Sequence, residues 1–347
     1  MSLATDYRPT NFESVVGQQT TVKILKQQLA SDNLVGCYLF CGPSGCGKTT
    51  IARIFSNEMN DYKGHPIEID AASNNSVDNV RLIIQNAKQR SLDSKYKIYI
   101  IDECHALSNA SWQAFLKLIE EPIPFTKFIF CTTNPEKIPT TILTRVQQFN
   151  FTKVTSEDIK NRLKYIISCE RDKLFSENPE SESLGAPDYE YSEEALDYIV
   201  SLSNNGVRQA IASLEKCLAY STELCMENVT AALGSGNYEN MSQFINAVMS
   251  SDTNTSISIL ENLYQDGIDP KQFIYNCLIF VLDLNKSKLS SVNNILPDIE
   301  PVVNLLQYNS KFLWLLSNLS KLYEEIRYEN NPLPVIEISI FNWSCQA

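Results

Sequence analysis

The sequence contains few of the residues on which metal sites and membrane spans depend. Only two of its 347 residues are histidine, and none of its ten cysteines belongs to a CxxC pair. Structural zinc sites need such ligands at short spacing, so we expect no zinc. No apolar run approaches the roughly 18 residues of a membrane-spanning helix, and the opening MSLATDYRPT has no signal-peptide core. We therefore expect a cytoplasmic protein with reduced thiols and no membrane partner.

The sequence also has fewer basic than acidic residues. The chain has 29 Lys and Arg against 41 Asp and Glu, a net charge of −12, which argues against a sequence-independent DNA coat. The deficit is uneven, because residues 1–150 carry 15 basic and 14 acidic side chains while residues 151–347 carry 14 and 27. This change predicts a boundary near residue 150, and the length predicts two or three domains.

Short apolar runs alternate with helical patterns in the first 150 residues. One helical pattern starts at Thr49, and another starts after the N-cap candidate Ser108 and stops at Pro122. The alternation predicts an α/β fold with a parallel five-stranded sheet and helices on both faces. The predicted strands are residues 37–41 (CYLFC), 67–70 (IEID), 97–101 (KIYII), 127–131 (KFIFC) and 146–151 (VQQFNF).

Helical patterns dominate after residue 152, and no internal repeat is visible. The final segment, residues 334–343 (PVIEISIFNW), alternates like a strand but lies in a helical region, so both structures remain open. The acidic stretch 176–192 is predicted to be a mobile loop and Gly234–Asn237 a linker. Helices are predicted over residues 156–169, 193–203, 206–219 and much of 240–328.

The segment GPSGCGKT matches the phosphate-binding pattern GxxxxGK[ST] and lies between a predicted strand and a predicted helix. Its backbone N–H groups and the helix N-terminus favour phosphate there. Lys48 would reach the β- and γ-phosphates of a nucleotide, and Thr49 would bind Mg²⁺. The expected nucleotide-binding residues here are Gly42, Pro43, Ser44, Gly45, Cys46, Gly47, Lys48, Thr49 and Thr50.

Two acids end the predicted strand KIYIIDE. Asp102 can hold Mg²⁺ with Thr49, and Glu103 can orient and deprotonate an attacking water. Adjacent acids with a phosphate loop favour nucleotide hydrolysis over phosphoryl transfer to a small substrate. Two solvated acids at a strand end would be the simpler interpretation of this pair in isolation.

Four further residues have two interpretations each from spacing alone. Thr133 and Asn134 follow a strand and could sense the γ-phosphate, or could form a plain turn before Pro135. Arg145 and Arg208 could act on phosphate or could be ordinary surface residues.

Several stretches together resemble one family. They are YRPTNFESVVGQ (7–18), GPSGCGKT (42–49), EIDAASNNSVDNVR (68–81), KIYIIDECHALSNASWQAFLKLIEEP (97–122), FCTTNPEKIPTTILTRVQQF (130–149) and NNGVRQAIASL (204–214). The combination is similar to the gamma/tau subunits of the bacterial DNA polymerase III clamp loader, which are AAA+ ATPases. The likeness is dense over residues 5–220 and faint afterwards.

The resemblance assigns roles to the open residues. It implies that ATP and Mg²⁺ are bound, with Arg8, Pro9 and Val16 lining the adenine pocket. Thr133, with Asn134 beside it, falls on the family's sensor 1 position. Arg208 resembles sensor 2, a contact from the lid to the γ-phosphate of its own subunit.

The resemblance also implies an assembly. Arg145 in Thr-Arg-Val stands where the family has Ser-Arg-Cys, whose arginine reaches into a neighbouring subunit's ATP site. The implied partners are other clamp-loader subunits in a five-subunit spiral, a sliding clamp and primer–template DNA. The implied domains are an AAA+ ATPase domain (1–152), a helical lid (153–234) and a helical collar (238–347).

DNA is expected on the inner face of the first domain. Backbone N–H groups and short polar side chains there could track phosphates without reading sequence. The candidates are Asn74, Asn75, Ser76 and Arg81. A basic run of Lys88, Arg90, Lys95 and Lys97 could also contact DNA or be a solvated helix end.

Three departures from the family pattern bear on these expectations. Residues 56–66 fill the place of a four-cysteine zinc module and contain no cysteine, so no zinc is expected there. Thr-Arg-Val replaces Ser-Arg-Cys, which keeps the arginine. The chain ends at Ala347, as a short motor-only form would, and its composition suits a virus-encoded version or a divergent AT-rich bacterium.

Two other functions remain open at this point. One is a different AAA+ motor, such as a helicase loader or a branch-migration ATPase, although no winged-helix strand signal follows residue 230. The other is a non-catalytic scaffold that binds ATP, which the presence of Lys48, Asp102, Glu103 and Arg145 disfavours.

Overall fold

The chain forms two compact units. The computed structural model describes residues 2–177, 189–203, 205–233, 238–265, 267–289 and 311–346. The first unit is Met1–Tyr189 with Leu196–Glu215, and the second is Glu190–Ala195 with Lys216–Ala347. The large sheet and the phosphate loop belong to the first unit. The division into domains at 1–152, 153–234 and 238–347 stays a prediction.

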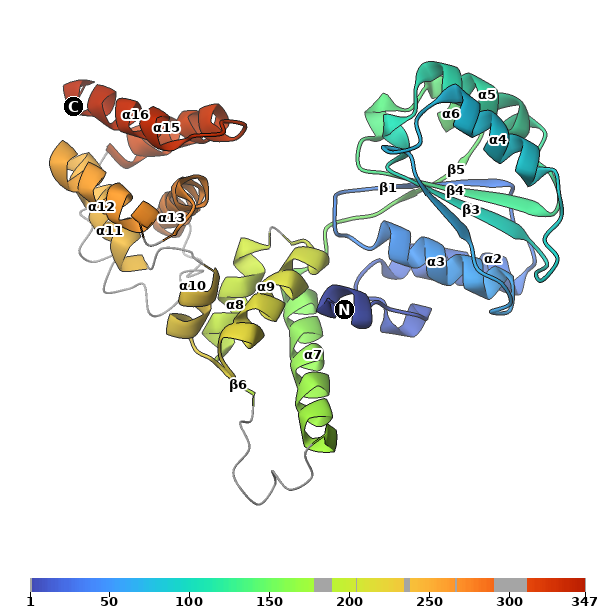
Figure 1. The fold of residues 1–347 in the computed structure, drawn as a ribbon, viewed down its shortest axis with the longest axis horizontal. Coiled ribbons are helices and arrows are strands. Elements are labelled where there is room, and N and C mark those ends of the chain that lie inside the picture. Colours follow the sequence, from blue (N-terminus) through green and yellow to red (C-terminus); the bar gives the residue numbers. More distant parts are fainter. Residues whose placement is uncertain are drawn as a thin grey trace. The chain divides into compact units, whose positions relative to one another are not determined.

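A five-stranded parallel sheet forms the centre of the first unit (Figure 1). Its strand order is β2-β3-β4-β1-β5, and every neighbouring pair is parallel. The predicted strands are confirmed to within one residue at each end. They are β1 Cys37–Cys41, β2 Ile67–Asp70, β3 Lys97–Asp102, β4 Thr126–Thr132 and β5 Gln147–Asn150. The central strands β1, β3 and β4 are buried and read as continuous apolar runs, whereas the edge strands β2 and β5 are more exposed.

Helices cover both faces of this sheet (Figure 1). On one face, α2 (Gln19–Ala30) and α3 (Lys48–Met59) bury Phe55 against Tyr38 of β1, with ring centroids 5.1 Å apart. On the other, α4 (Val77–Ala87), α5 (Asn109–Glu120) and α6 (Thr140–Leu143) bury Phe115 against Phe130 of β4, at 5.5 Å. The predicted α/β class is therefore confirmed.

The chain's own signals set the limits of α5. The Ser108 side chain accepts a hydrogen bond from the backbone N–H of Ser111 at 3.1 Å, as an N-cap does. The helix ends at Glu120, two residues before Pro122, which cannot continue a helix.

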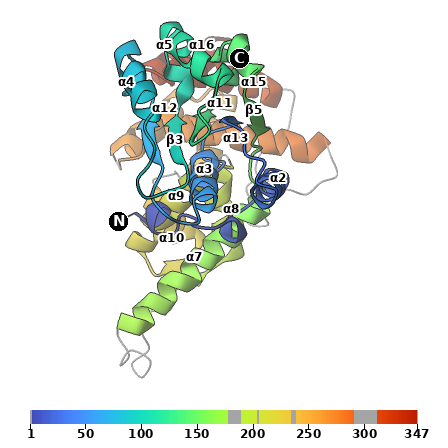
Figure 2. The same cartoon turned by 90° about the vertical axis from the view of Figure 1, so that its right-hand side faces the viewer.

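Helices follow the sheet, as predicted, in both units. The helix α7 (Ser156–Glu177) runs past the predicted end at residue 169 (Figures 1 and 2). It is followed by α8 (Glu193–Leu202) and α9 (Val207–Tyr220). Two short strands, β6 (Glu190–Tyr191) and β7 (Glu223–Leu224), pair in the second unit. The sequence did not predict them, because two residues are too few to show alternation.

The second unit is a helical bundle with its own apolar core. Phe244, Phe273 and Leu315 are buried in it, and the rings of Phe244 and Phe273 lie 5.4 Å apart. Its helices are α10 (Met226–Leu233), α11 (Tyr238–Met249), α12 (Thr253–Gln265), α13 (Pro270–Leu289), α15 (Lys311–Ile326) and α16 (Leu333–Gln346).

The ambiguous final segment is helical. Ile336, Ile340 and Trp343 are buried at intervals of four and three residues, while Ile338 and Phe341 are exposed. The spacing of buried positions is that of a helix, so the strand interpretation of PVIEISIFNW is wrong.

Two expectations fall largely outside the described residues. Of the predicted acidic loop 176–192, residues 178–188 are not described, and neither is the predicted linker Gly234–Asn237. Among the described helices, none is both long and apolar enough to cross a bilayer.

Candidate nucleotide-binding site

The phosphate loop connects β1 to α3 at the carboxyl edge of the sheet. Gly45 and Gly47 have φ angles of +74° and +97°, a left-handed backbone that favours glycine. A Cβ on Gly45 would lie 3.2 Å from the Cα of Gly206, just before α9. The loop therefore passes directly against the start of a helix far along the chain.

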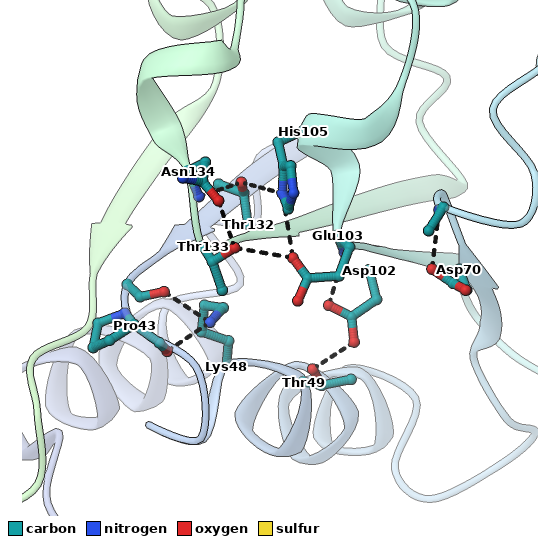
Figure 3. Close-up of polar contacts among 12 residues, drawn as sticks. Pro43, Lys48, Thr49, Asp70, Asp102, Glu103, His105, Thr132, Thr133 and Asn134 are labelled. Carbon is teal, nitrogen blue, oxygen red and sulfur yellow. Dashed lines mark hydrogen bonds and ion pairs between the residues drawn. The ribbon is translucent and has the colours of Figure 1, made fainter. Parts of the chain in front are cut away.

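Lys48 begins α3 and folds back over the loop (Figure 3). Its ammonium Nζ donates to the carbonyl oxygens of Gly42 and Pro43, each at 2.8 Å, and the residue is buried. An ammonium has three N–H donors, so one more can reach a phosphate oxygen.

Asp102 ends β3 opposite the start of α3. The Thr49 hydroxyl donates to Asp102 Oδ2 at 2.8 Å, and the Glu103 backbone N–H donates to Oδ1 at 2.9 Å (Figure 3). A hydroxyl and a carboxylate side by side are oxygen ligands of the kind that Mg²⁺ prefers, so the residues present fit this ion. A metal site built from protein side chains alone is a different case: within the described ranges, no group of three or more His, Cys, Asp and Glu side chains could hold a metal ion.

Glu103 has an unusual backbone. Its φ and ψ are 47° and 41°, a left-handed conformation that costs a non-glycine residue about 1 kcal/mol. The carboxylate points toward the end of β4, where its Oε2 lies 3.2 Å from Thr133 Oγ1 and 3.2 Å from His105 Nδ1 (Figure 3). The structure thus brings Glu103 and Thr133 together, as a shared γ-phosphate site requires.

One cavity of the first unit joins the loop to the predicted base-side residues. It is lined by residues 44–50, by Asp102 and Glu103, and by Arg8, Pro9, Val16 and Arg208. Burial, followed by the like charge of Arg53, lowers the pKa of Arg8. The opposite charge of Asp102 and the like charge of Arg208 also act on Arg8, so these three groups share one electrostatic environment.

Two residues at this site were not predicted. Arg162 of α7 lines the cavity, donates to the Tyr7 carbonyl, and lies 5.0 Å over the Tyr165 ring. Gln18 bonds the Thr152 backbone twice, donating to its carbonyl at 2.6 Å and accepting from its N–H at 3.2 Å. Gln18 lies in the quoted YRPTNFESVVGQ stretch, which was the available signal, whereas no motif marked Arg162.

Arg145 lies elsewhere on the first unit. It does not line the cavity, and its side chain is about two-fifths exposed. Its Nε bonds Glu120 Oε1 at 2.9 Å, and its Nη1 donates to the Thr141 carbonyl at 2.7 Å. Asn134 is also outside the lining, but its Oδ1 lies 2.9 Å from the Thr133 hydroxyl.

The candidate DNA contacts gather at the start of α4. Ser76 caps this helix by accepting from the Asn79 N–H at 3.2 Å, and Asn74 donates to the Asp70 carbonyl. Asn75 and Arg81 are exposed, and Arg81 pairs with Asp78 in solvent. These residues form one polar, largely exposed segment.

Solved structures support the fold. RuvB of Thermotoga maritima, titled a Holliday junction branch migration motor, aligns with a TM-score of 0.51 at 18% identity over 70% of this chain and 79% of that one. A mutant of the same RuvB gives the same TM-score at 19% identity, over 65% of this chain and 72% of that one. This likeness, together with the five-stranded parallel sheet, confirms the predicted α/β fold.

Sequence relatives identify the family. The family model described as DNA polymerase III, delta subunit, matches residues 65–155. DNA polymerase III subunit tau of Bacillus subtilis is 29% identical over 96% of this chain, which spans 61% of that protein's length. DNA polymerase III subunit gamma of Buchnera aphidicola is 30% identical, with 80% of this chain and 78% of that protein covered. The chain belongs to the DNA polymerase III gamma/tau family.

Proposed function

We propose that this protein is an ATPase motor subunit of a sliding-clamp loader. It would open a polymerase processivity clamp and place it on primer–template DNA, with ATP hydrolysed at subunit interfaces. The observation that carries the proposal is the cavity in which Lys48, Thr49, Asp102 and Glu103 meet beside Arg208. The chain spans only part of several relatives, so this role goes beyond the family assignment.

Each side chain of the cavity has a task in hydrolysis. Lys48 and the loop N–H groups hold the β- and γ-phosphates, and Arg8, Pro9 and Val16 hold the base. Thr49 and Asp102 hold Mg²⁺, which offsets phosphate charge when bound. Glu103 orients a water molecule and accepts its proton. General-base catalysis of this kind raises a reaction rate about 10²- to 10⁴-fold. Thr133 senses the γ-phosphate, with Asn134 beside it, and Arg208 contacts that phosphate from the same chain.

Arg145 would complete the site of a neighbouring subunit. Its absence from the lining of the cavity in its own chain and its exposure suit a residue that acts in trans. An isolated chain then has an incomplete site, so rapid turnover requires assembly. ATP binding would favour tight binding of the clamp and DNA, and ATP hydrolysis would weaken that binding and release the clamp.

The remaining parts of the chain would serve this assembly. Asn74, Asn75, Ser76 and Arg81 would face the DNA backbone, residues 153–234 would form the lid, and residues 238–347 would form the collar. The apolar core of the second unit suits a collar, although it would equally suit an ordinary bundle.

The test is the rate of ATP hydrolysis by the full chain, assembled with the other clamp-loader subunits. The rate is measured with and without primed DNA and a candidate clamp. We expect strong stimulation only when both are present, together with a complex of several subunits by mass measurement. A rate that responds to DNA alone and not to any clamp would favour a different AAA+ motor. No hydrolysis under any condition would favour a scaffold.

A further inference from the structure

His105 follows the end of β3 and Glu103, and it has no role in the nucleotide site as described so far. We propose that His105 is a positioning residue: its Nδ1–H holds Glu103 Oε2 so that Oε1 is the oxygen that accepts a proton from water. This inference rests on the proposed hydrolysis of ATP. It adds a group that does not touch the substrate but determines how the general base is presented.

The Glu103 carboxylate makes its described contacts through one of its two oxygens. Oε2 lies 3.2 Å from both Thr133 Oγ1 and His105 Nδ1, and no partner of Oε1 is seen among the described residues (Figure 3). A carboxylate held at one oxygen keeps its orientation and leaves the other oxygen available as a base.

Thr133 alone cannot provide this hold. Its hydroxyl has a single proton and two acceptors in reach, Asn134 Oδ1 at 2.9 Å and Glu103 Oε2 at 3.2 Å. In the proposed function this hydroxyl also senses the γ-phosphate, so it must leave Glu103 when a nucleotide is bound. His105 Nδ1 would then be the one remaining group in contact with Oε2 among the described residues.

The proposed role requires one tautomer of His105, with the proton on Nδ1. Nδ1 forms a hydrogen bond of 3.2 Å with Thr132 Oγ1, whose direction depends on the tautomer, and this oxygen also accepts from the Asn134 N–H at 3.0 Å. An ionised carboxylate only accepts hydrogen bonds, so Nδ1 must be the protonated nitrogen if it bonds Glu103. With the proton on Nδ1, two acceptor oxygens lie 3.2 Å from this donor.

Packing and backbone geometry hold this arrangement in place. The Thr132 side chain is fully buried, and that of His105 is about one-fifth exposed. Glu103 keeps its left-handed backbone, which places its side chain toward the end of β4. A conformation of this kind persists where surrounding contacts over-determine it.

The first experiment tests the contact between His105 and Glu103 and does not depend on ATP turnover. The chain has two histidines, so ¹⁵N-labelled imidazole signals come from His105 and His65, and His65 is exposed and serves as the internal reference. We expect the His105 proton on Nδ1, with a signal that moves in Glu103→Ala while the His65 signal stays. A proton on Nε2, or an Nδ1 signal indifferent to Glu103→Ala, would overturn the contact.

The second experiment reads the positioning role, in the assembled protein with primed DNA and clamp. His105→Phe fills the space without a donor, and we expect kcat to fall roughly 10- to 100-fold, as misplacement of a catalytic group does, with KM for ATP unchanged. His105→Asn supplies a donor close to the Nδ1 position and should restore most of kcat. His65→Ala is the matched control and should behave as the parent.

A double-mutant cycle separates positioning from general packing. In a Glu103→Gln background, His105→Phe should cause no further loss, because its effect passes through the carboxylate. A further loss there, or a His105→Phe protein with the parent's kcat, would refute the role. A parent that hydrolyses no ATP while the Nδ1 signal still responds to Glu103→Ala would refute the proposed function and reduce the contact to packing.

Discussion

Replacing Arg145 with alanine should separate stability from turnover more clearly than any other single change. In the isolated chain the side chain forms one ion pair with Glu120, with the two side chains 39% and 43% exposed. Its Nη1 also donates to the Thr141 carbonyl at 2.7 Å and to the Thr144 hydroxyl at 3.2 Å. An exposed pair contributes about 0–1 kcal/mol, and a hydrogen bond about 1 kcal/mol. Arg145→Ala should therefore lower the free energy of unfolding by no more than about 3 kcal/mol.

The effect of Arg145→Ala on turnover should be much larger. An arginine finger contributes about 10³-fold or more to kcat, or about 4 kcal/mol of barrier. Urea unfolding gives the first quantity, and ATP turnover with primed DNA and clamp gives the second. Lys26→Ala is a suitable control, because it removes an exposed pair with Glu13 and lies outside the cavity. Turnover of Arg145→Ala at the parent's rate would refute the finger, as would a turnover loss fully explained by unfolding.

Three further predictions concern the phosphate loop and its ion. Lys48→Ala should abolish binding of a fluorescent ATP analogue, and an unchanged affinity would contradict the assigned role. Without nucleotide, Gly45→Ala should lower the Tm more than Gly47→Ala, because both backbones are left-handed but only a Cβ on Gly45 meets Gly206; equal losses would argue against that approach. Removing Mg²⁺ with a chelator should stop hydrolysis and excess Mg²⁺ should restore it, whereas turnover that persists without Mg²⁺ would exclude the Thr49–Asp102 site.

Local patterns made the sheet and the phosphate loop predictable. The central strands β1, β3 and β4 are buried on both faces, so they appear in the sequence as apolar runs, and the helical patterns between the strands indicate parallel pairing. The strand order was not predicted, because β1 and β2, and likewise β4 and β5, follow each other in the chain without pairing. The loop was predictable because its glycine positions fix a backbone that few sequences can adopt. The final segment stayed ambiguous because its alternation is typical of a strand, whereas burial of Ile336, Ile340 and Trp343 shows the helical period.

Contacts between distant residues were the part that sequence could not provide. Arg162 reaches the Tyr7 carbonyl across 155 residues, and Gln18 reaches Thr152 across 134. His105 is near Glu103 in sequence, but its significance depends on Thr132 and Thr133 of another strand. Periodicity and spacing report the path of the chain, and they do not report which polar side chains meet at the edge of the sheet.

The central claim is that one chain supplies Glu103 and its neighbour supplies Arg145. The most direct measurement mixes two variants, Glu103→Gln and Arg145→Ala, each nearly inactive alone, and records ATP turnover after they assemble with primed DNA and clamp. An equal mixture forms interfaces that pair an intact Glu103 with an intact Arg145, and random head-to-tail pairing predicts about a quarter of the parent's turnover. A mixture no more active than its two components would contradict the account.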